Sequence, residues 1–421
     1  MNRREFFGSA ASLSAAAQAL GGADIDTAPD FASLRADFPR ATNETYFNSA
    51  AQHPLSIHAV RGMERYIEFM HKGPGEGRSD FWEEGFLQVK PMFARLINAK
   101  PNEIALCPST TVGENMVLNG MDLAGGNVVT NDLHYTSSLA DYLTRRMDGL
   151  DVRIVKNRDW HIDLRDMEQA VDRKTRLIAV SLVSSVNGHM ENIRALSDLA
   201  HAHGGYLFAD IIQAAGAVPI DVRAMGIDMA SCGMYKWLQG EHGYGFLYVR
   251  EDLIGSVVKP TEFGGHPDYN YPPWVKAPVP GRPELALHTA SAGGSLECGT
   301  PSVITYAAQY ESFKYIEKLR VPRIQEHAQT LVRQLRKQLP ALGYTPITPS
   351  DAGTPIITFQ CKDAEVVKNK IREAARTGRA RISITGPNSA LTVGRFGNHV
   401  RFSVSVFNNR DDVNRVLEVL A

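Results

Sequence analysis

Residues 176–183 form a nearly unbroken apolar run with the length of one β-strand. A strand that shows no polar alternation is expected to be covered on both faces, which is typical of the central strands of a parallel sheet. Residues 193–203 follow with apolar side chains at helical spacing, and residues 206–209 form the next apolar strand. The same strand–helix–strand order extends over residues 103–249, so the sequence predicts an α/β protein with a mostly parallel sheet.

The pattern changes beyond a loop at residues 263–283 that is rich in Gly, Pro and aromatic residues. A long amphipathic stretch at 303–339 follows, interrupted at Pro322, and short strands and helices continue to the C-terminus. These features predict a second, smaller α+β domain. We expect four segments: a signal peptide at 1–19, a leader at 20–45, a large domain at 46–305 and a small domain at 306–421.

Composition excludes several classes of protein. The 45 Lys and Arg residues nearly balance the 46 Asp and Glu residues, so no basic excess is available to bind nucleic acid. No apolar run approaches the ~18 residues that a membrane-spanning helix needs. The four cysteines are scattered without a C-x-x-C pair, which argues against zinc-ribbon and thioredoxin-type sites. We therefore expect reduced thiols and no metal centre.

The N-terminus has the features of an export signal. Arg3 and Arg4 precede two phenylalanines and a mildly apolar stretch rich in Ala and Ser, and Ala17-Gln18-Ala19 supplies a small-residue cleavage site. This order resembles a twin-arginine (Tat) signal, a route that carries folded proteins. It predicts a periplasmic protein; the alternative is a cytoplasmic protein whose frayed N-terminal helix carries two solvated arginines.

Polar residues follow several of the predicted strands at the point where each strand ends. Asp210 closes one strand, with Gln213 three residues later, and Lys236 comes just before the strand at 243–249. Ser109-Thr110-Thr111 follows an earlier strand and opens a helix. Because ligands bind at the carboxyl ends of the strands in such sheets, we expect these side chains to share one site.

These motifs resemble the class V aminotransferase family of fold-type I enzymes that use pyridoxal 5′-phosphate (PLP). The Asp-x-x-Gln of Asp210 and Gln213 and the Tyr-Lys-Trp-Leu around Lys236 carry the resemblance, which runs in order over residues 45–410. The family includes cysteine desulfurases, isopenicillin N epimerase-like proteins and kynureninase. The resemblance implies a large domain with a mostly parallel sheet of the seven-stranded type and a smaller C-terminal domain.

The resemblance assigns the catalytic residues. Lys236 would form the Schiff base with the cofactor aldehyde, and Asp210 would hold the protonated pyridine nitrogen. Gln213 would reach the ring hydroxyl, and Tyr135 would stack on the ring, with neighbouring His134 as the alternative. The simpler interpretations are a solvated loop lysine for Lys236, a helix N-cap for Asp210 and ordinary core packing for Tyr135.

Phosphate and substrate contacts are also implied. Thr110 and Thr111, at a helix N-terminus that favours anions, and Tyr235 would hold the phosphate. Thr300 would be a further phosphate donor that reaches the neighbouring subunit, which implies a homodimer with shared sites. Two positions depart from the family, which often has Ser where this chain has Gly233 and Asn where it has Ser185. The substrate-binding residues would be Asn48, His134 and Arg401, whose guanidinium fork matches an amino-acid carboxylate.

The absence of a cysteine from one predicted loop limits the reactions that we expect of this chain. Desulfurases of this family use a nucleophilic cysteine on a loop before the motif of Arg401, and residues 382–399 contain none, while Cys361 lies in an apolar strand pattern. On this ground we exclude a cysteine desulfurase and expect an aminotransferase or epimerase acting at Cα. Export to the periplasm would be consistent with an enzyme that modifies a secreted metabolite such as a siderophore.

Three other functions are alternatives for a sequence of this kind. The first alternative is a C–S or C–N lyase of the same family, and the second is a non-catalytic PLP-fold binding protein, against which the presence of Lys236 and Asp210 argues. A nucleotide-dependent oxidoreductase would need a G-x-G-x-x-G turn after an early strand. The glycines at residues 120–126 do not have that spacing, so we reject this function.

Overall fold

The computed structural model describes residues 30–73, 85–263, 291–383 and 398–421. The predicted signal peptide and most of the loop at 382–399 lie outside these ranges. Within the described residues, no helix combines the length and the apolar character needed to cross a bilayer.

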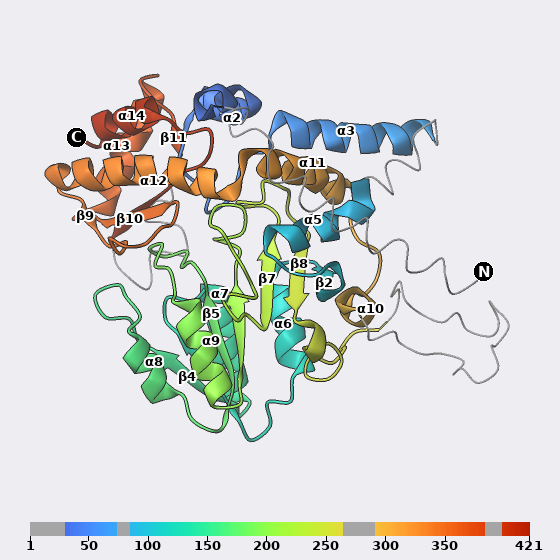
Figure 1. Cartoon of the computed structure of the whole chain (residues 1–421). Helices are drawn as coiled ribbons and strands as arrows, with labels where there is room; N and C mark the ends of the chain where they lie inside the picture. Colours follow the sequence, from blue (N-terminus) through green and yellow to red (C-terminus); the bar gives the residue numbers. More distant parts are fainter. Residues whose placement is uncertain (1–29, 74–84, 264–290, 384–397) are drawn as a thin grey trace, which may run out of the picture.

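The large domain is built on one seven-stranded sheet (Figure 1). Six strands are parallel to one another and β8 alone is antiparallel to its neighbours. This arrangement confirms the predicted fold class. Across the sheet the order of strands is β2 (Ile104–Cys107), β8 (Gly245–Val249), β7 (Met229–Gly233), β6 (Tyr206–Asp210), β5 (Thr175–Ser181), β3 (Asn127–Asn131) and β4 (Asp151–Val155).

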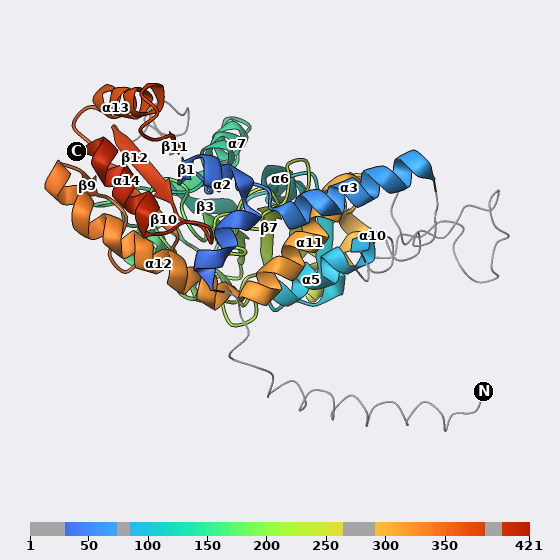
Figure 2. The same cartoon turned by 90° about the horizontal axis from the view of Figure 1, so that it is seen from above.

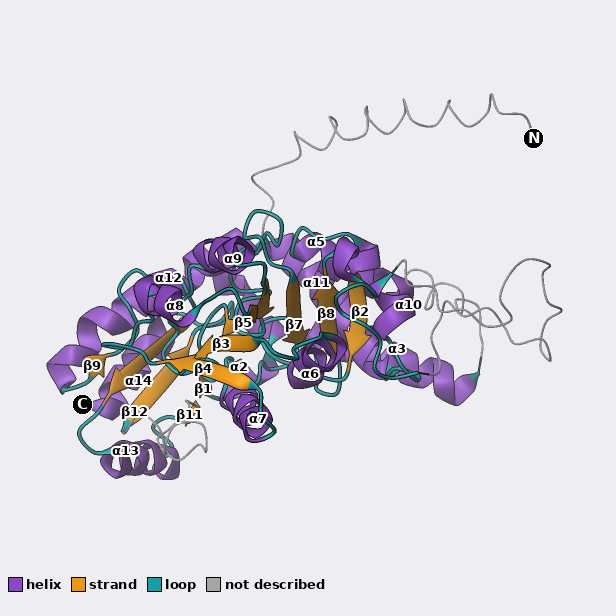
Figure 3. Cartoon of the chain, turned by 90° about the horizontal axis from the view of Figure 1, so that it is seen from below, coloured by secondary structure: helices purple, strands orange, loops and turns teal. Residues whose placement is uncertain are grey.

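Both faces of the sheet are buried, which explains the apolar runs of its strands. In β6, Leu207 and Ala209 belong to one core while Phe208 between them belongs to the other. The first core is closed by α5 (Val89–Leu96) and α9 (Ile193–Ala202), and the second by α6 (Thr110–Gly120) and α7 (Thr136–Met147). Figure 3 shows these two pairs of helices on opposite sides of the strands. Two shorter helices complete the domain, α8 (Leu164–Ala170) and α10 (Ala292–Leu296).

A long helix pair covers the upper edge of the large domain. Helix α3 (Ile57–Lys72) lies along α11 (Val303–Leu319) in both Figure 1 and Figure 2. The two helices approach closely at Gly62, where an added Cβ atom would stand 2.4 Å from the backbone oxygen of Ala307. A glycine is therefore required at this crossing by the space available.

The amphipathic stretch predicted at 303–339 is two helices. Helix α11 ends at Leu319 and α12 (Val321–Gln338) begins two residues later. Arg320 joins them with a φ of 64°. Pro322 lies in the first turn of α12, where its missing N–H costs no hydrogen bond.

The small domain has a three-stranded antiparallel sheet in which β10 (Ile356–Gln360) lies between β12 (His399–Ser403) and β9 (Thr345–Pro346). Its helices are α12, α13 (Ala364–Arg376) and α14 (Arg410–Leu420). The N-terminal segment also packs here: β1 (Thr45–Tyr46) pairs in parallel with β11 (Ile382–Ser383). Two short helices precede β1, η1 (Phe31–Asp37) and α2 (Pro39–Asn43).

Candidate active site

The carboxyl ends of the parallel strands place most of the predicted residues along one edge of the sheet. Asp210 is the last residue of β6, Lys236 follows β7, and Tyr135 follows β3. Thr110 and Thr111 begin helix α6 directly after β2. Residues from four separate parts of the sequence therefore lie along this edge, because β2, β7, β6 and β3 run in the same direction in one sheet, with β8 between β2 and β7 and β5 between β6 and β3.

Lys236 is a buried amine and not a solvated one. Its side chain is only 6% exposed, and its Nζ atom lies 5.8 Å from the centroid of the Tyr135 ring and 5.5 Å from that of Tyr235. Burial lowers the pKa of Lys236 to about 8, although the negative charge of Asp210 opposes this effect; the positive charge of Arg401 adds to it. About a tenth of such an amine is neutral, and therefore nucleophilic, at pH 7, far more than of an ordinary lysine.

Asp210 is a buried carboxylate at the end of its strand. Its Oδ1 atom accepts a hydrogen bond of 2.9 Å from the backbone N–H of Ile212. The residues that follow form turns, so Asp210 is not the N-cap of a helix. Burial raises the pKa of Asp210, while the charges of His134 and Lys236 oppose this increase. A cationic partner would therefore stabilise its ionised form.

Gln213 connects the lysine loop to the N-terminal segment. Its Nε2 atom donates to the backbone oxygen of Ala50 at 2.9 Å, and its Oε1 atom accepts from the Trp237 indole at 2.9 Å. An amide carries two N–H donors, so one of them is left for a further bond.

The N-terminus of α6 provides a place for an anion. Ser109 caps the helix by accepting from the backbone N–H of Val112, and the first turn carries no acidic residue. Thr110 is buried and accepts a 2.8 Å hydrogen bond from the backbone N–H of Gly233. A Cβ atom on Gly233 would lie 3.2 Å from both Ile212 and Tyr235. A serine here would therefore require these two side chains to move by a few tenths of an ångström.

Two of the implied cofactor contacts differ in exposure. Tyr235 is partly buried beside Lys236, whereas Thr300 is exposed on the chain that follows α10. The exposure of Thr300 leaves its hydroxyl accessible to a second subunit, and the shared site itself stays a prediction.

His134 does not face the same space as Tyr135. Its ring is fully buried, with Nδ1 2.8 Å from the Ser181 hydroxyl and Nε2 3.2 Å from Glu114 Oε1. The structure therefore separates the two neighbours: Tyr135 lies next to the Lys236 amine, and His134 lies behind it. Sequence reasoning missed Ser181 and Glu114, and the only signal was a charged residue on the otherwise apolar face of α6.

The substrate candidates meet where the small domain contacts the large one. Arg401, in β12, is 2% exposed, and its Nη1 atom donates to the backbone oxygen of Ser185. Burial lowers the pKa of Arg401 to about 10, which still leaves the guanidinium charged at neutral pH. Asn48 forms a β-bridge with Ser403 in the same strand as Arg401. These contacts join residues that are 216 to 355 positions apart in the sequence.

Together these groups fit PLP. The cofactor presents an aldehyde to an amine, a cationic ring nitrogen to a carboxylate, and a phosphate to a helix N-terminus. The chain supplies a buried Lys236, a buried Asp210 and the start of α6 at one edge of the sheet. Tyr135 adds a flat ring close to the amine.

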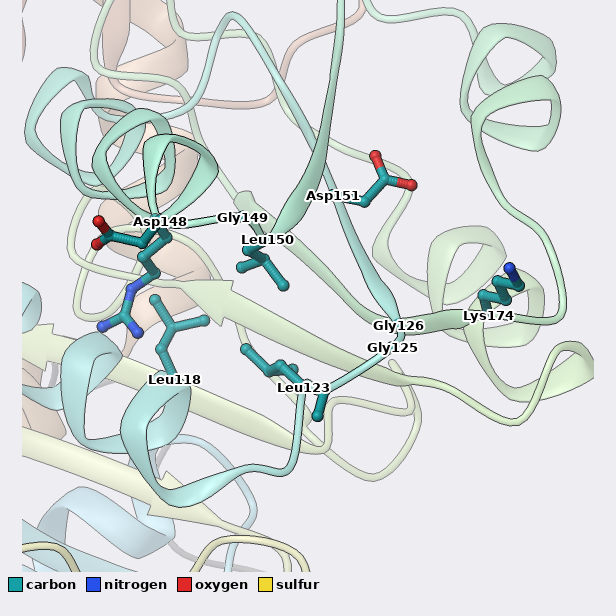
Figure 4. Close-up of a pocket in the computed structure, with 11 residues that line it drawn as sticks. Leu118, Leu123, Gly125, Gly126, Asp148, Gly149, Leu150, Asp151 and Lys174 are labelled. Carbon is teal, nitrogen blue, oxygen red and sulfur yellow. The ribbon is translucent and has the colours of Figure 1, made fainter.

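A hollow at the opposite edge of the sheet is a separate feature (Figure 4). It has a volume of about 600 Å³ and lies before the starts of β3, β4 and β5. Leu118, Leu123 and Leu150 form its apolar part, with Asp148 on one side and Lys174 on the other. None of its lining residues is among those predicted for the active site, and the parallel strands direct that chemistry to the other edge.

The chain is similar to known proteins of one family. The family model described as aminotransferase class-V matches residues 45–416. A probable cysteine desulfurase of Methanothermobacter thermautotrophicus is 27% identical over 309 residues, which cover 72% of this chain and 74% of the relative.

Solved structures show the same fold. The cysteine desulfurase CsdA of Escherichia coli superposes with a TM-score of 0.79 at 19% identity, covering 93% of this chain and 97% of the other. The cystine C–S lyase C-DES, in complex with its product cysteine persulfide, has a TM-score of 0.77 at 18% identity and covers 91% and 98%. A C-DES variant with glycine linked to its PLP cofactor has a TM-score of 0.76 at 20% identity, with coverages of 93% and 99%.

These comparisons correct one prediction. The exclusion of a cysteine desulfurase, and with it the preference for a transferase or isomerase, is wrong, because relatives and structural neighbours that cover most of the chain are cysteine desulfurases or a C–S lyase. The physical reason is that a C–S bond can also be broken by β-elimination, in which the sulfur leaves with the bonding electron pair and no loop cysteine is needed. The groups that act at Cα do not include it.

Proposed function

The chain belongs to the aminotransferase class-V family, and from this premise we propose that it is a PLP-dependent enzyme that cleaves the Cβ–S bond of cysteine or cystine. The observation that carries the proposal is the convergence of three buried groups, Lys236, Asp210 and Arg401, at one edge of the sheet. The substrate class is supported by the names of the relatives and of the structural neighbours.

Different residues of the chain would bind the cofactor and the substrate. Thr110, Thr111 and Tyr235 would hold the phosphate of PLP, and Asp210 the ring nitrogen. When bound, the cofactor supplies an electron sink for the charge that develops at the substrate Cα. Arg401 binds the α-carboxylate by two parallel hydrogen bonds and so orients the Cα–H bond toward Lys236.

Lys236 is the proton carrier. With a pKa of about 8 in the site, its Nζ atom can accept the Cα proton in the neutral form and return it in the charged form. Loss of this proton allows the sulfur to leave Cβ with the bonding electron pair. The burial of the Lys236 amine and of Asp210 excludes bulk water from the proton while it is held.

Cysteine thiols of this chain differ in their ability to receive sulfur. Cys107, Cys232 and Cys361 are buried, and burial raises the pKa of each thiol, so none of the three is poised as a thiolate. Cys298 is exposed. With no cysteine in residues 382–399, we expect the sulfur to leave as free sulfide from cysteine or as cysteine persulfide from cystine.

The test is to incubate the purified PLP-loaded protein with L-cysteine and with L-cystine. We expect sulfide from cysteine or cysteine persulfide from cystine, each accompanied by pyruvate and ammonia, and none of these products from the Lys236→Ala variant. Amino-group transfer to a keto acid without release of sulfur would overturn the proposal. Binding of PLP with no turnover of either amino acid would favour a binding protein instead.

A further inference from the structure

Glu114 is a buried carboxylate that the proposed reaction does not use. It lies on helix α6 and is only 2% exposed. Three side chains surround it: the hydroxyl of Ser138 donates to Oε2 at 2.5 Å, the hydroxyl of Tyr142 donates to Oε1 at 2.7 Å, and His134 Nε2 stands 3.2 Å from Oε1. Burying an ionised carboxylate is costly unless the charge is paired and hydrogen-bonded, and Glu114 has three side-chain partners that supply this.

A continuous chain of contacts joins Glu114 to Asp210. On the far side of the imidazole, His134 Nδ1 lies 2.8 Å from the hydroxyl oxygen of Ser181. That hydroxyl in turn donates to Asp210 Oδ2 at 3.5 Å. The members come from helix α6, the segment after β3, and the ends of β5 and β6, and all of them are buried.

The number of hydrogen atoms along this chain decides the charge of His134. An ionised Glu114 only accepts, so His134 Nε2 must donate to it. An ionised Asp210 also only accepts, so Ser181 gives its one hydroxyl hydrogen to Asp210, and its oxygen must then accept from Nδ1. Both ring nitrogens then carry a proton, and His134 is an imidazolium between two carboxylates.

We propose that Glu114 is a positioning residue that holds His134 as an imidazolium, and that His134, through Ser181, keeps Asp210 ionised where it faces the ring nitrogen of the cofactor. This inference rests on the proposed role of Asp210 in binding PLP. Glu114 itself touches neither cofactor nor substrate; it acts on the site through two other side chains.

The pKa directions agree with the geometry. Burial alone would raise the pKa of Glu114, but the charge of His134 and the hydrogen bonds from His134, Ser138 and Tyr142 lower it. For Asp210, burial raises the pKa and the charge of His134 opposes that increase. Without an imidazolium beside it, Asp210 becomes a stronger base and takes the proton of the cofactor ring for itself.

The first experiment measures His134 directly in the full-length, cofactor-free protein, by nitrogen NMR of isotope-labelled histidine at neutral pH. We expect the two ring nitrogens of His134, identified by their loss in His134→Asn, to have the shifts of an imidazolium. In Glu114→Gln, one of them should shift to the position of an unprotonated nitrogen. A neutral His134 in the wild-type protein would overturn the proposal without any variant.

The chain offers a matched control. Glu191 is also a buried carboxylate next to a buried histidine, with His189 Nε2 at 3.6 Å and a 2.9 Å hydrogen bond from Asn131. Among the contacts of the described residues its side chain touches none of Glu114, His134, Ser181 and Asp210, although its partner Asn131 accepts a hydrogen bond from the backbone N–H of His134. Glu191→Gln should therefore leave the His134 signals unchanged; an equal change in both variants would show a general structural effect and overturn the proposal.

The second experiment uses PLP labelled at its ring nitrogen. In the loaded wild-type protein we expect a protonated nitrogen, and in Glu114→Gln a drop of about tenfold in the ratio of protonated to unprotonated ring, equivalent to one pKa unit. An unchanged ratio would refute the coupling to Asp210. If PLP did not bind to the wild-type protein, the proposed function would be refuted. The protonation state of His134, measured in the first experiment, would still test this inference.

Discussion

Arg401, in the small domain, donates a hydrogen bond to the backbone carbonyl of Ser185, in the loop that follows β5 of the large domain. The two residues are 216 positions apart. This contact fixes a buried guanidinium at the edge of the sheet where Lys236 and Asp210 lie, close enough for its charge to lower the pKa of Lys236. The substrate-binding group and the proton carrier therefore depend on the same packing of one domain against the other.

Replacing Arg401 by glutamine should weaken the binding of substrates that carry an α-carboxylate. Removing one partner of a buried charge pair costs about 2–5 kcal/mol, so we expect kcat/KM for cysteine to fall by about 30-fold or more. Arg401→Lys keeps the charge but loses the two parallel hydrogen bonds of the guanidinium. Its kcat/KM for cysteine should lie between those of the wild type and of Arg401→Gln. Cysteamine, which lacks the carboxylate, is the control: its poor turnover should be the same in all three proteins. An equal loss for cysteine and cysteamine would contradict the assignment.

The attachment of PLP to the cofactor-free protein should depend on pH with a midpoint near 8. Burial lowers the pKa of Lys236 to about 8, so the reactive neutral amine increases as the pH rises through that value, whereas an ordinary lysine would need a pH near 10.5. The rate of formation of the borohydride-reducible linkage measures this directly. Arg401→Gln should move the midpoint up and Asp210→Asn should move it down, because these two charges act on Lys236 in opposite senses. Shifts of the same sign would show that the charges do not act as described.

Gly62→Ala should destabilise the protein without altering the site. The new Cβ atom would lie 2.4 Å from the backbone oxygen of Ala307, and the two helices must separate to admit it. Overpacking of this kind costs about 1–3 kcal/mol, measurable as a lower urea midpoint at an unchanged slope. Arg61→Ala, an exposed neighbour on the same helix, should stay within about 0.5 kcal/mol of the wild type. Equal stability of the two variants would refute the close crossing.

We predict that the active site is shared between two subunits. Chains carrying Lys236→Ala and chains carrying Thr300→Arg should each be inactive, and a mixed dimer should recover one intact site, because both lesions then fall in the other site. The recovered activity is measured after co-expression with two different affinity tags, which isolates the mixed dimer. Full activity of a monomer in sedimentation, or no recovery in proven mixed dimers, would exclude sharing.

The N-terminal arginines should direct export. Replacement of Arg3 and Arg4 by lysines preserves the charge but removes the pair that the twin-arginine route recognises, so the protein should remain in the cytoplasm. Fractionation of cells that express the full-length chain measures the outcome. A variant that still appears in the periplasm in processed form would disprove the signal.

Much of the large domain could be predicted because its information is local. Apolar runs of strand length and helical spacing are properties of short windows, and a strand buried on both faces has to be apolar whatever packs on it. Asp210, Lys236 and the threonines that begin α6 were found because parallel strands place their ends together. Strand ends are therefore enough to propose which polar residues share a site.

One prediction of the reaction was wrong because it rested on a single missing cysteine. The absence of a cysteine in residues 382–399 suggested that no desulfurase was possible, yet relatives that cover most of the chain carry that name. A loop thiol is needed only where it attacks the sulfur itself, whereas elimination releases the sulfur with its bonding electron pair and needs no thiol. The groups that act at Cα are the better guide to the class of reaction.

The sequence by itself determined the layered α/β fold, the order of its strands and helices, and the residues at the strand ends. Only the tertiary structure decided that His134 turns away from Tyr135 toward Ser181 and Glu114, that Arg401 reaches Ser185 of the large domain, and that Asn48 pairs with Ser403. The physical reason is that local patterns depend on which face of one element is buried. The charge state of a buried residue depends instead on partners that packing brings in from distant parts of the chain.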